Sequence, residues 1–417
     1  MSKFLKSLCK IAIPVTLQSM LQASFSIVDQ IMIGQLGETN ISAVGLCGNF
    51  SLIFSVVIGA VSTVAGILIA QFIGAEESKE AWCSFDVSLI CGIIMSVLFL
   101  LAAGVFPSQI LGLYTKDMSI INAGTVYFRI VAFSYIPMAV SNILSSWLRC
   151  KEYATIPFLA SFGAVIVNTG LNYLLIFGKF GFPRLGIGGA AVSTFLVRVV
   201  EFLIICGYLF VVEKQICFRV KNLWMKTDIF SEYVKLGFPV MVSDFFIAVA
   251  DSVVMMIIGR MGAAFVAANA VAAVVMNMAS ILIQGIGQAS SIITGNTLGE
   301  GRVEEALKQG YAFLGLGIGI GFVMSVLILI LSEEIILAYQ LSANTAGIAR
   351  QLMWAIAFIN VFQSANSILT KGVLRGGGDT RMLMITDSIF MWIVAIPLGS
   401  VTGLVLGLPA FWVYFCL

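Results

Sequence analysis

Residues 28–37 read Val-Asp-Gln-Ile-Met-Ile-Gly-Gln-Leu-Gly, and residues 253–262 read Val-Val-Met-Met-Ile-Ile-Gly-Arg-Met-Gly. The second stretch follows the first by 225 residues. Further residues repeat at the same offset without a gap, in the pairs Pro14–Pro239, Gly74–Gly299 and Glu80–Glu305. The sequence therefore predicts two copies of one structural unit. The copies differ in their acidic groups, because Asp29 of the first copy is matched by Val254 in the second.

The composition places both copies in a membrane. Of the 417 residues, 60% are hydrophobic and 11% are charged, and the mean hydropathy is +1.04. An ordinary soluble domain carries about 25% charged residues, so the long apolar runs predict a multi-pass helical protein of the lipid bilayer. The chain has no histidine, no phosphate-binding loop and no basic tract. We therefore expect no enzyme activity, no cofactor and no nucleic-acid partner.

The apolar runs predict twelve membrane spans in an all-α integral membrane protein, at about 11–33, 43–70, 84–106, 121–148, 157–178, 185–212, 234–258, 266–296, 310–331, 347–372, 381–405 and 408 onward. The last run is too short to cross about 30 Å of hydrocarbon, so the twelfth helix is expected to be truncated in this sequence. We expect an amino-terminal six-helix lobe at 1–212, a cytoplasmic linker at 213–232 and a carboxy-terminal lobe at 233–417. An even number of spans per copy predicts a pseudo-twofold axis along the membrane normal.

Lysine and arginine set the expected orientation. Most of them fall in segments that share a side with the amino terminus, beginning with Lys3, Lys6 and Lys10. Because cytoplasmic loops are enriched in positive residues, we place the amino terminus in the cytoplasm and the protein in the plasma (inner) membrane.

Asp29 is the sharpest signal of function in the first lobe. Gln18, Gln22, Ser26 and Asp29 recur at helical spacing, so one face of the first span is polar and should line a cavity. A carboxylate at mid-membrane depth costs about 2.5–3.5 kcal/mol on insertion scales, which favours a functional role over simple packing. A duplicated bundle with such a carboxylate in one half is typical of an ion-coupled transporter.

Two amides extend this candidate site. Asn168 and Asn172 are four residues apart and share one face of the fifth span, and Thr194 adds a hydroxyl from the sixth. Oxygen ligands of this kind suit Na⁺, and they equally suit hydrogen bonds to a protonated Asp29. A site for Na⁺ at Asp29, Asn168 and Asn172, or for H⁺, is therefore expected. Arg198 and Glu201 of the sixth span are expected either to form an internal ion pair or to extend toward the cytoplasmic surface.

The second lobe carries its polar groups elsewhere. Asp244 and Asp251 lie about two turns apart on one face of the seventh span, and glutamines follow on later spans. We predict a substrate cavity lined by Gln22, Asp244, Asp251, Gln284, Gln288 and Gln363. Most methionine and phenylalanine residues are expected to face lipid or the core, and a minority to line an adaptable apolar cavity for small, cationic or amphipathic molecules.

The repeated stretch resembles the first-span signature of the multidrug and toxic compound extrusion (MATE) family. Leu148-Arg149 and the run Leu374-Arg375-Gly376-Gly377-Gly378-Asp379-Thr380 are similar to the family's paired cytoplasmic elements, and 185–191 resembles its sixth-span start. The resemblance covers nearly the whole chain. It implies a twelve-helix exporter with two six-helix lobes that expels organic, often cationic drugs in exchange for Na⁺ or H⁺. We expect the protein to act as a monomer, by alternating access between the two lobes.

The resemblance also implies that Asp29, Asn168, Asn172 and Thr194 form the coupling site. The tenth span, with only Asn, Gln and Ser at candidate positions, departs from family members that carry an acidic residue there. A rival of the same architecture is a flippase for lipids or lipid-linked oligosaccharides. Such a flippase would need a more cationic central cavity for phosphate headgroups than these spans provide.

Overall fold

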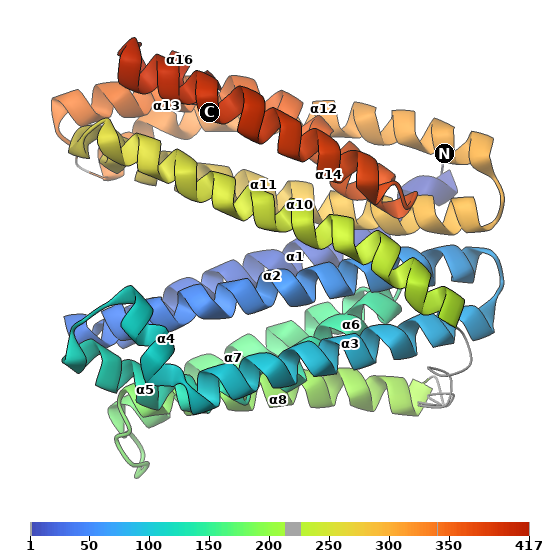
Figure 1. The fold of residues 1–417 in the computed structure, drawn as a ribbon, viewed down its shortest axis with the longest axis horizontal. Helices are drawn as coiled ribbons and strands as arrows, with labels where there is room; N and C mark the ends of the chain where they lie inside the picture. Colours follow the sequence, from blue (N-terminus) through green and yellow to red (C-terminus); the bar gives the residue numbers. More distant parts are fainter. Residues whose placement is uncertain (1, 213–226, 340, 417) are drawn as a thin grey trace. The chain divides into compact units, whose positions relative to one another are not determined.

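The computed structural model describes residues 2–212, 227–339 and 341–416, and helices make up nearly all of them. The chain divides into two compact units, residues 1–234 (unit 1) and 235–417 (unit 2). Of the predicted linker at 213–232, residues 213–226 lie outside the described residues, and α10 (Thr227–Arg260) begins within the remainder. The two units are treated separately below (Figure 1).

Unit 1 is an all-helical bundle. Its helices are α1 (Ser2–Gly34), α2 (Glu38–Gly74), α3 (Ser78–Val105), α4 (Pro107–Tyr114), α5 (Met118–Ala132), α6 (Tyr135–Cys150), α7 (Thr155–Phe177) and α8 (Ile187–Val212). Helix α7 packs against both α1 and α8, and α2 packs against α3, α5 and α6. This arrangement puts the polar faces of α1, α7 and α8 next to one another.

The predicted span at 121–148 is broken rather than continuous. Helices α5 and α6 together have the length and hydropathy of one span, but they meet at an angle of 44°. Pro137 lies in the first turn of α6 and has no N–H to continue a ladder from α5. At the break, the Val131 carbonyl accepts from the backbone N–H of Ser134 at 2.8 Å and from the Ser134 hydroxyl at 2.6 Å.

Unit 2 repeats the long helices of unit 1. After α10 come α11 (Ala263–Gly299), α12 (Val303–Ala338), α13 (Ala343–Ser367), the π-helical segment η1 (Ile368–Leu374), α14 (Thr380–Ile389), η2 (Phe390–Ala395), α15 (Ile396–Ser400), η3 (Val401–Val405) and α16 (Ala410–Cys416). Within the described residues, ten helices are long and apolar enough to cross a membrane, or eleven if the bent pair is one span. They correspond to the first eleven predicted spans.

The repeated glycines form equivalent turns. Gly37 precedes α2 with φ 96°, and Gly262 precedes α11 with φ 110°. Only glycine adopts such angles without strain, so the repeat preserves the sharp reversal between its first two helices. The 225-residue repeat in the sequence is thus a repeat in backbone conformation.

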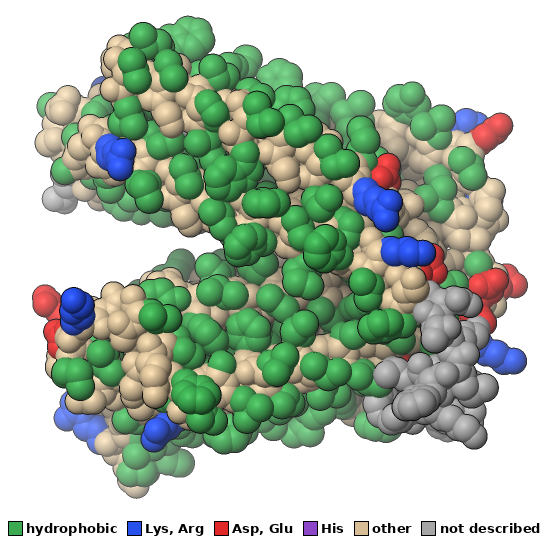
Figure 2. All heavy atoms as spheres, viewed as in Figure 1, with side chains coloured by type: hydrophobic (Ala, Val, Ile, Leu, Met, Phe, Trp, Pro, Cys, Tyr) green, Lys and Arg blue, Asp and Glu red, His purple; other side chains and the backbone are tan. Residues whose placement is uncertain are grey.

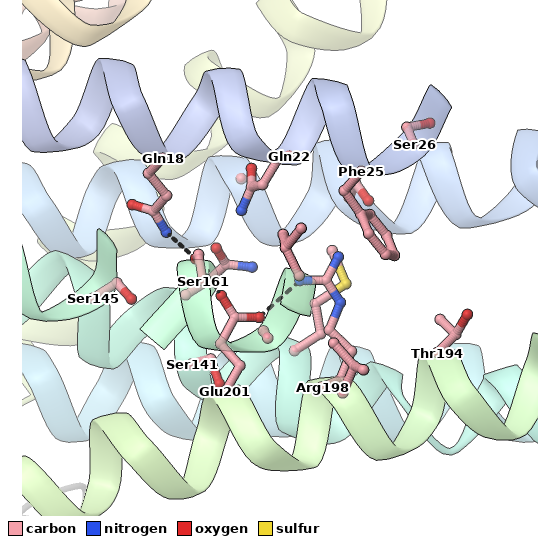
Figure 3. Close-up of a pocket in the computed structure, with 17 residues that line it drawn as sticks. Gln18, Gln22, Phe25, Ser26, Ser141, Ser145, Ser161, Thr194, Arg198 and Glu201 are labelled. Atoms are coloured by element: carbon pink, nitrogen blue, oxygen red, sulfur yellow. Dashed lines mark hydrogen bonds and ion pairs between the residues drawn. The ribbon is translucent and has the colours of Figure 1, made fainter. Parts of the chain in front are cut away.

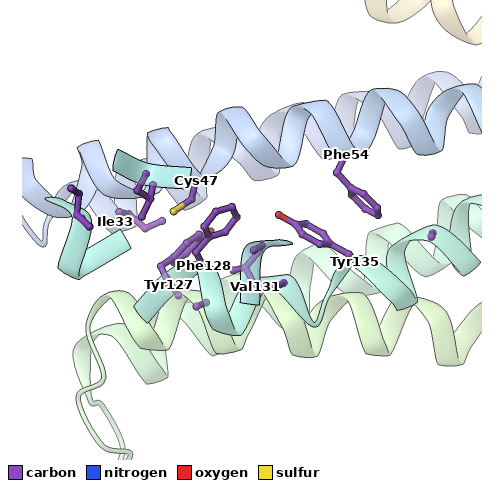
Figure 4. Packing of buried hydrophobic residues seen from close by; sticks show 14 of the residues in the cluster. Ile33, Cys47, Phe54, Tyr127, Phe128, Val131 and Tyr135 are labelled. Atoms are coloured by element: carbon purple, nitrogen blue, oxygen red, sulfur yellow. The ribbon is translucent and has the colours of Figure 1, made fainter. Parts of the chain in front are cut away.

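Apolar residues fill the interior and also cover the outside. In unit 1 an aromatic cluster joins α2, α5 and α6, with Phe54 4.3 Å from Tyr135 between ring centroids (Figure 4). On the visible face, hydrophobic side chains cover the flanks of the helices, and charged side chains gather toward their ends (Figure 2). Helices that are apolar all round belong in lipid rather than in water.

Candidate functional site

Asp29 contacts Asn172 where α1 packs on α7, and Asn172 in turn contacts Asn168. The Asn172 Nδ2 donates to Asp29 Oδ1 at 2.6 Å and to Asn168 Oδ1 at 2.7 Å. Both asparagines are fully buried, at 1% and 0% exposure, whereas Asp29 is half-buried. The four-residue spacing on α7 places the two amides one turn apart, so they form a short polar chain that ends at the carboxylate.

This chain of groups leaves two hydrogen-bonding atoms unused. Asn172 Oδ1 and Asn168 Nδ2 are buried without a hydrogen-bond partner among the described residues. A buried amide oxygen without a donor costs about 1–3 kcal/mol, which a bound cation or water would offset. Beside a carboxylate, such an oxygen supplies a second ligand of the type that hard cations prefer.

Thr194 lies at the same site through Tyr127. The Thr194 hydroxyl donates to the Ala190 carbonyl at 3.0 Å and lies near buried Tyr127 of α5. Tyr127 lies close enough to Asp29 to interact electrostatically with its carboxylate. All four residues of the predicted coupling site therefore lie in one region of unit 1. The aromatic hydroxyl that links them was not anticipated, because nothing in the sequence around Tyr127 distinguishes it from other interior aromatic residues.

A cavity of about 420 Å³ opens next to this region, between α1, α2, α6, α7 and α8 (Figure 3). Thr194 and Ser26 line it, as does Gln22, which the sequence predicts as a cavity residue. Pockets of roughly 300–1,000 Å³ hold drug-sized molecules. Of the polar face predicted for the first span, Gln18, Gln22 and Ser26 line this cavity, whereas Asp29 is not among its lining residues.

A hydrogen-bonded network closes one wall of the cavity. Arg149 donates to Gln18 Oε1 at 3.0 Å, Gln18 Nε2 donates to the Ser161 hydroxyl at 2.9 Å, and that hydroxyl donates to Glu201 Oε1 at 2.7 Å. Arg198 completes it with an ion pair of 2.9 Å to Glu201 Oε2. Helices α6, α1, α7 and α8 are joined in this way. The internal ion pair expected from sequence is part of a larger polar assembly.

Unit 2 places its predicted residues in different surroundings. Asp244 accepts a hydrogen bond from buried Arg375 at 2.7 Å, in an ion pair that no local pattern in the sequence reveals. Asp251 is exposed on the same helix, with Lys371 close enough to act on it electrostatically. Within the described residues, no hydrogen bond or ion pair joins Asp251 to Asp244. The three predicted glutamines are exposed side chains at positions Gln284, Gln288 and Gln363.

A half-buried carboxylate held by amides, in a repeated bundle of membrane-crossing helices with its own cavity, defines the class of polytopic membrane transporters. Among curated proteins, the chain is 27% identical to the multidrug resistance protein NorM of Vibrio vulnificus, over 98% of this chain and 91% of that protein. It is 26% identical to the probable multidrug resistance protein NorM of Thermotoga maritima, over 95% and 85%.

Solved structures share the fold. A crystal structure of the Vibrio cholerae MATE transporter VcmN matches with a TM-score of 0.90 at 16% identity, over 100% of this chain and 93% of that one. An outward-facing multidrug resistance MATE family transporter matches with a TM-score of 0.87 at 18% identity, over 99% and 91%. The chain belongs to the MatE family, whose sequence profile matches residues 14–174 and 239–401. It is therefore a transporter of that family and not an enzyme.

Proposed function

We propose that the protein exports small organic molecules by secondary active antiport, with Na⁺ or H⁺ as the coupling ion. The observation that carries the proposal is the half-buried Asp29 carboxylate bound to the Asn172–Asn168 chain. The relatives named as multidrug resistance proteins support export as the direction and drugs as the cargo. Substrates would be cationic or amphipathic molecules.

The coupling site would consist of Asp29, Asn168, Asn172 and Thr194. Na⁺ would take the carboxylate of Asp29 and the unused Asn172 Oδ1 as ligands, with Asn168 and Thr194 holding their neighbours in position. A proton would instead neutralise Asp29, and the amide chain would then bind the neutral acid. Both ions fit a site with one carboxylate and neutral partners, so the choice between them needs a transport measurement.

Transport would follow alternating access by the two halves of the chain. The coupling ion can drive the change only through a difference in its affinity for the two states. Binding at Asp29 would alter the contact of α1 with α7, because Asn172 donates to Asp29 across that contact. The polar residues of unit 2, including Asp244 and Asp251, would contribute to the substrate surface. The protein would act as a monomer in the plasma (inner) membrane with a cytoplasmic amino terminus.

The deciding experiment is drug uptake into inverted vesicles under separate Na⁺ and H⁺ gradients. We expect one gradient to drive uptake of a cationic dye such as ethidium, and Asp29→Asn to abolish this dependence. Glu38→Gln is the matched control, because Glu38 is an exposed carboxylate in the first turn of the next helix. Unchanged gradient-driven uptake by Asp29→Asn would refute the assignment of this carboxylate as the coupling group.

A further inference from the structure

Arg129 of α5 is a cation for which the described chain supplies no anion. The side chain is exposed, and among the described residues it takes part in no hydrogen bond or ion pair. It nevertheless belongs to a membrane span, because α5 and α6 together have the length and hydropathy of one. Charged side chains in such segments usually pair with another group or line a water-filled path. We therefore looked for a partner outside the chain.

Arg129 lies near the membrane surface rather than at mid-depth. The hydroxyl of Ser108, in the first turn of α4, shares a hydrogen bond of 3.1 Å with that of Thr125. Because α3 ends at Val105, this bond places Thr125 close to the level at which α3 ends. Arg129 is one helical turn, about 6 Å, further along α5. Helical side chains lean toward the helix N-terminus, so the guanidinium can reach back over Thr125 to the headgroup region.

The repeat shows that the fold does not require a cation at this position. The 225-residue offset holds for this helix, because Asp117 caps the start of α5 and Ser342 caps the start of α13. At the position that matches Arg129, unit 2 has Trp354, which is 60% exposed. Tryptophan is common where a helix meets the membrane interface. The position is therefore exposed in both copies, and only unit 1 places a charge there.

Unit 2 also shows how an exposed arginine on this helix is paired within the chain. The residues that match Ser108 and Thr125 are Glu333 and Arg350, and both pairs are separated by 17 residues. Glu333 accepts from Arg350 at 2.8 Å. Position 108 of unit 1 has a hydroxyl in place of this carboxylate. The equivalent surface of unit 1 therefore has hydrogen-bond donors and a positive charge where unit 2 has a closed ion pair.

This polar surface continues into an apolar one on the same side of α5. Asn122 is exposed and lies two turns before Arg129, so it extends the polar part toward the start of the helix. Phe133 lies one turn beyond Arg129, is 58% exposed, and packs its ring 6.4 Å from that of Phe195 on α8. Val126, which is 51% exposed, lies between them. Donors near the membrane surface are thus followed by apolar side chains deeper in the span.

We propose that this face of α5 binds an anionic phospholipid, with Arg129 holding the phosphate and Phe133 supporting an acyl chain. The arginine fork matches phosphate oxygens, and Asn122 and Ser108 supply further donors beside it. In the proposed orientation the lipid belongs to the outer leaflet. The inference goes beyond the proposed function, because it depends on neither the coupling ion nor the cargo.

Lipid binding to the purified full chain in detergent, followed by native mass spectrometry, tests the proposal. The probes are dioleoylphosphatidylglycerol and dioleoylphosphatidylcholine, which share their acyl chains and a phosphate but differ in net charge. We expect the native chain to prefer the phosphatidylglycerol. Arg129→Gln should lower this preference about fivefold, the effect of one cation near a membrane surface. Arg350→Gln is the matched control, because that arginine is also exposed but is already paired with Glu333.

A second pair of variants tests the position of the site without removing Arg129. Ser108→Glu gives unit 1 the acid that unit 2 has at the matching position, so it should pair with Arg129 and remove the preference. Ser108→Gln should keep the preference. The proposal is overturned if Arg129→Gln or Ser108→Glu keeps it, if Arg350→Gln lowers it equally, or if the native chain binds both lipids alike. Displacement of the phosphatidylglycerol by inorganic phosphate would also overturn it, because it would identify a site for soluble anions.

Discussion

The Arg375–Asp244 ion pair of unit 2 gives a prediction that separates a structural role from a substrate-binding one. The two side chains are 9% and 24% exposed, and their closest atoms, Arg375 NH2 and Asp244 Oδ1, are 2.7 Å apart. Removing one partner of a buried pair typically costs about 3–5 kcal/mol, because the other charge is left uncompensated. In Asp244→Asn an acceptor oxygen remains and solvent reaches part of the site, so we expect the free energy of unfolding to fall by about 2 kcal/mol.

Such a loss is measurable as an equilibrium shift. A cost of about 2 kcal/mol corresponds to a change of roughly thirtyfold in the unfolding equilibrium constant. Titrating the purified protein in dodecyl maltoside with sodium dodecyl sulfate, followed by tryptophan fluorescence, would report it. The matched control is Glu333→Gln, because Glu333 accepts from Arg350 at 2.8 Å in the same unit while both side chains are 53% exposed.

The control should lose much less stability than Asp244→Asn, because solvent screens an exposed ion pair. The comparison therefore tests whether the loss of stability depends on the burial of the ion pair rather than on its presence. Equal effects of the two substitutions would refute this reasoning. A large change in drug affinity by Asp244→Asn at unchanged stability would instead identify Asp244 as a ligand of the substrate.

Three further predictions concern unit 1. In Gly189→Ala the new Cβ would lie 2.5 Å from the Leu175 carbonyl oxygen, so overpacking should lower the free energy of unfolding by about 1–3 kcal/mol in the same titration. In the control Gly188→Ala the new Cβ meets nothing closer than 3.9 Å, so this variant should keep its stability. Asn172→Ala removes one oxygen ligand and the hydrogen-bond donor to Asp29. If the protein is coupled to Na⁺, vesicle uptake should show its Na⁺ affinity falling roughly tenfold. If it is coupled to H⁺, the same assay should show tighter proton binding. Burial raises the pKa of the Glu152 carboxyl, but hydrogen bonds from Ser7 and Lys10 outweigh this effect and hold the pKa below the usual 4.5. These hydrogen bonds therefore stabilise the fold at neutral pH, and this stabilisation is lost on acidification below about 4.5. In that acidic range the stabilities of the native chain and of Glu152→Gln should converge.

The membrane fold follows from the sequence because hydropathy acts locally. Apolar runs locate the long helices, and the 225-residue repeat predicts the matching turns at Gly37 and Gly262. The sequence predicts one span at 121–148 with Pro137 as a residue that can kink it, and the structure has a break between α5 and α6 next to Pro137. Proline is equally present inside the continuous helices α1 and α10, as Pro14 and Pro239, so its presence alone does not decide whether a span breaks.

The candidate site could be predicted only in part. Spacing alone placed Asn168 and Asn172 on one face, and the cost of a buried charge singled out Asp29. Contacts between residues far apart in the sequence could not be predicted, because hydropathy does not specify which helix faces pack together. Gln18 meets Arg149 across 131 residues, and Asp244 meets Arg375 across the same separation.

The neutral partners of Asp29 have a consequence for membrane voltage. The Arg375–Asp244 pair carries no net charge, so a transmembrane field does little work on it wherever unit 2 moves. Asp29 is bonded to an uncharged amide, so the proposed coupling site would have one negative charge when empty and none when it held Na⁺ or H⁺. Moving one charge through a full 100 mV is worth about 2.3 kcal/mol. The membrane potential should therefore bias the empty carrier and leave the loaded one nearly unaffected.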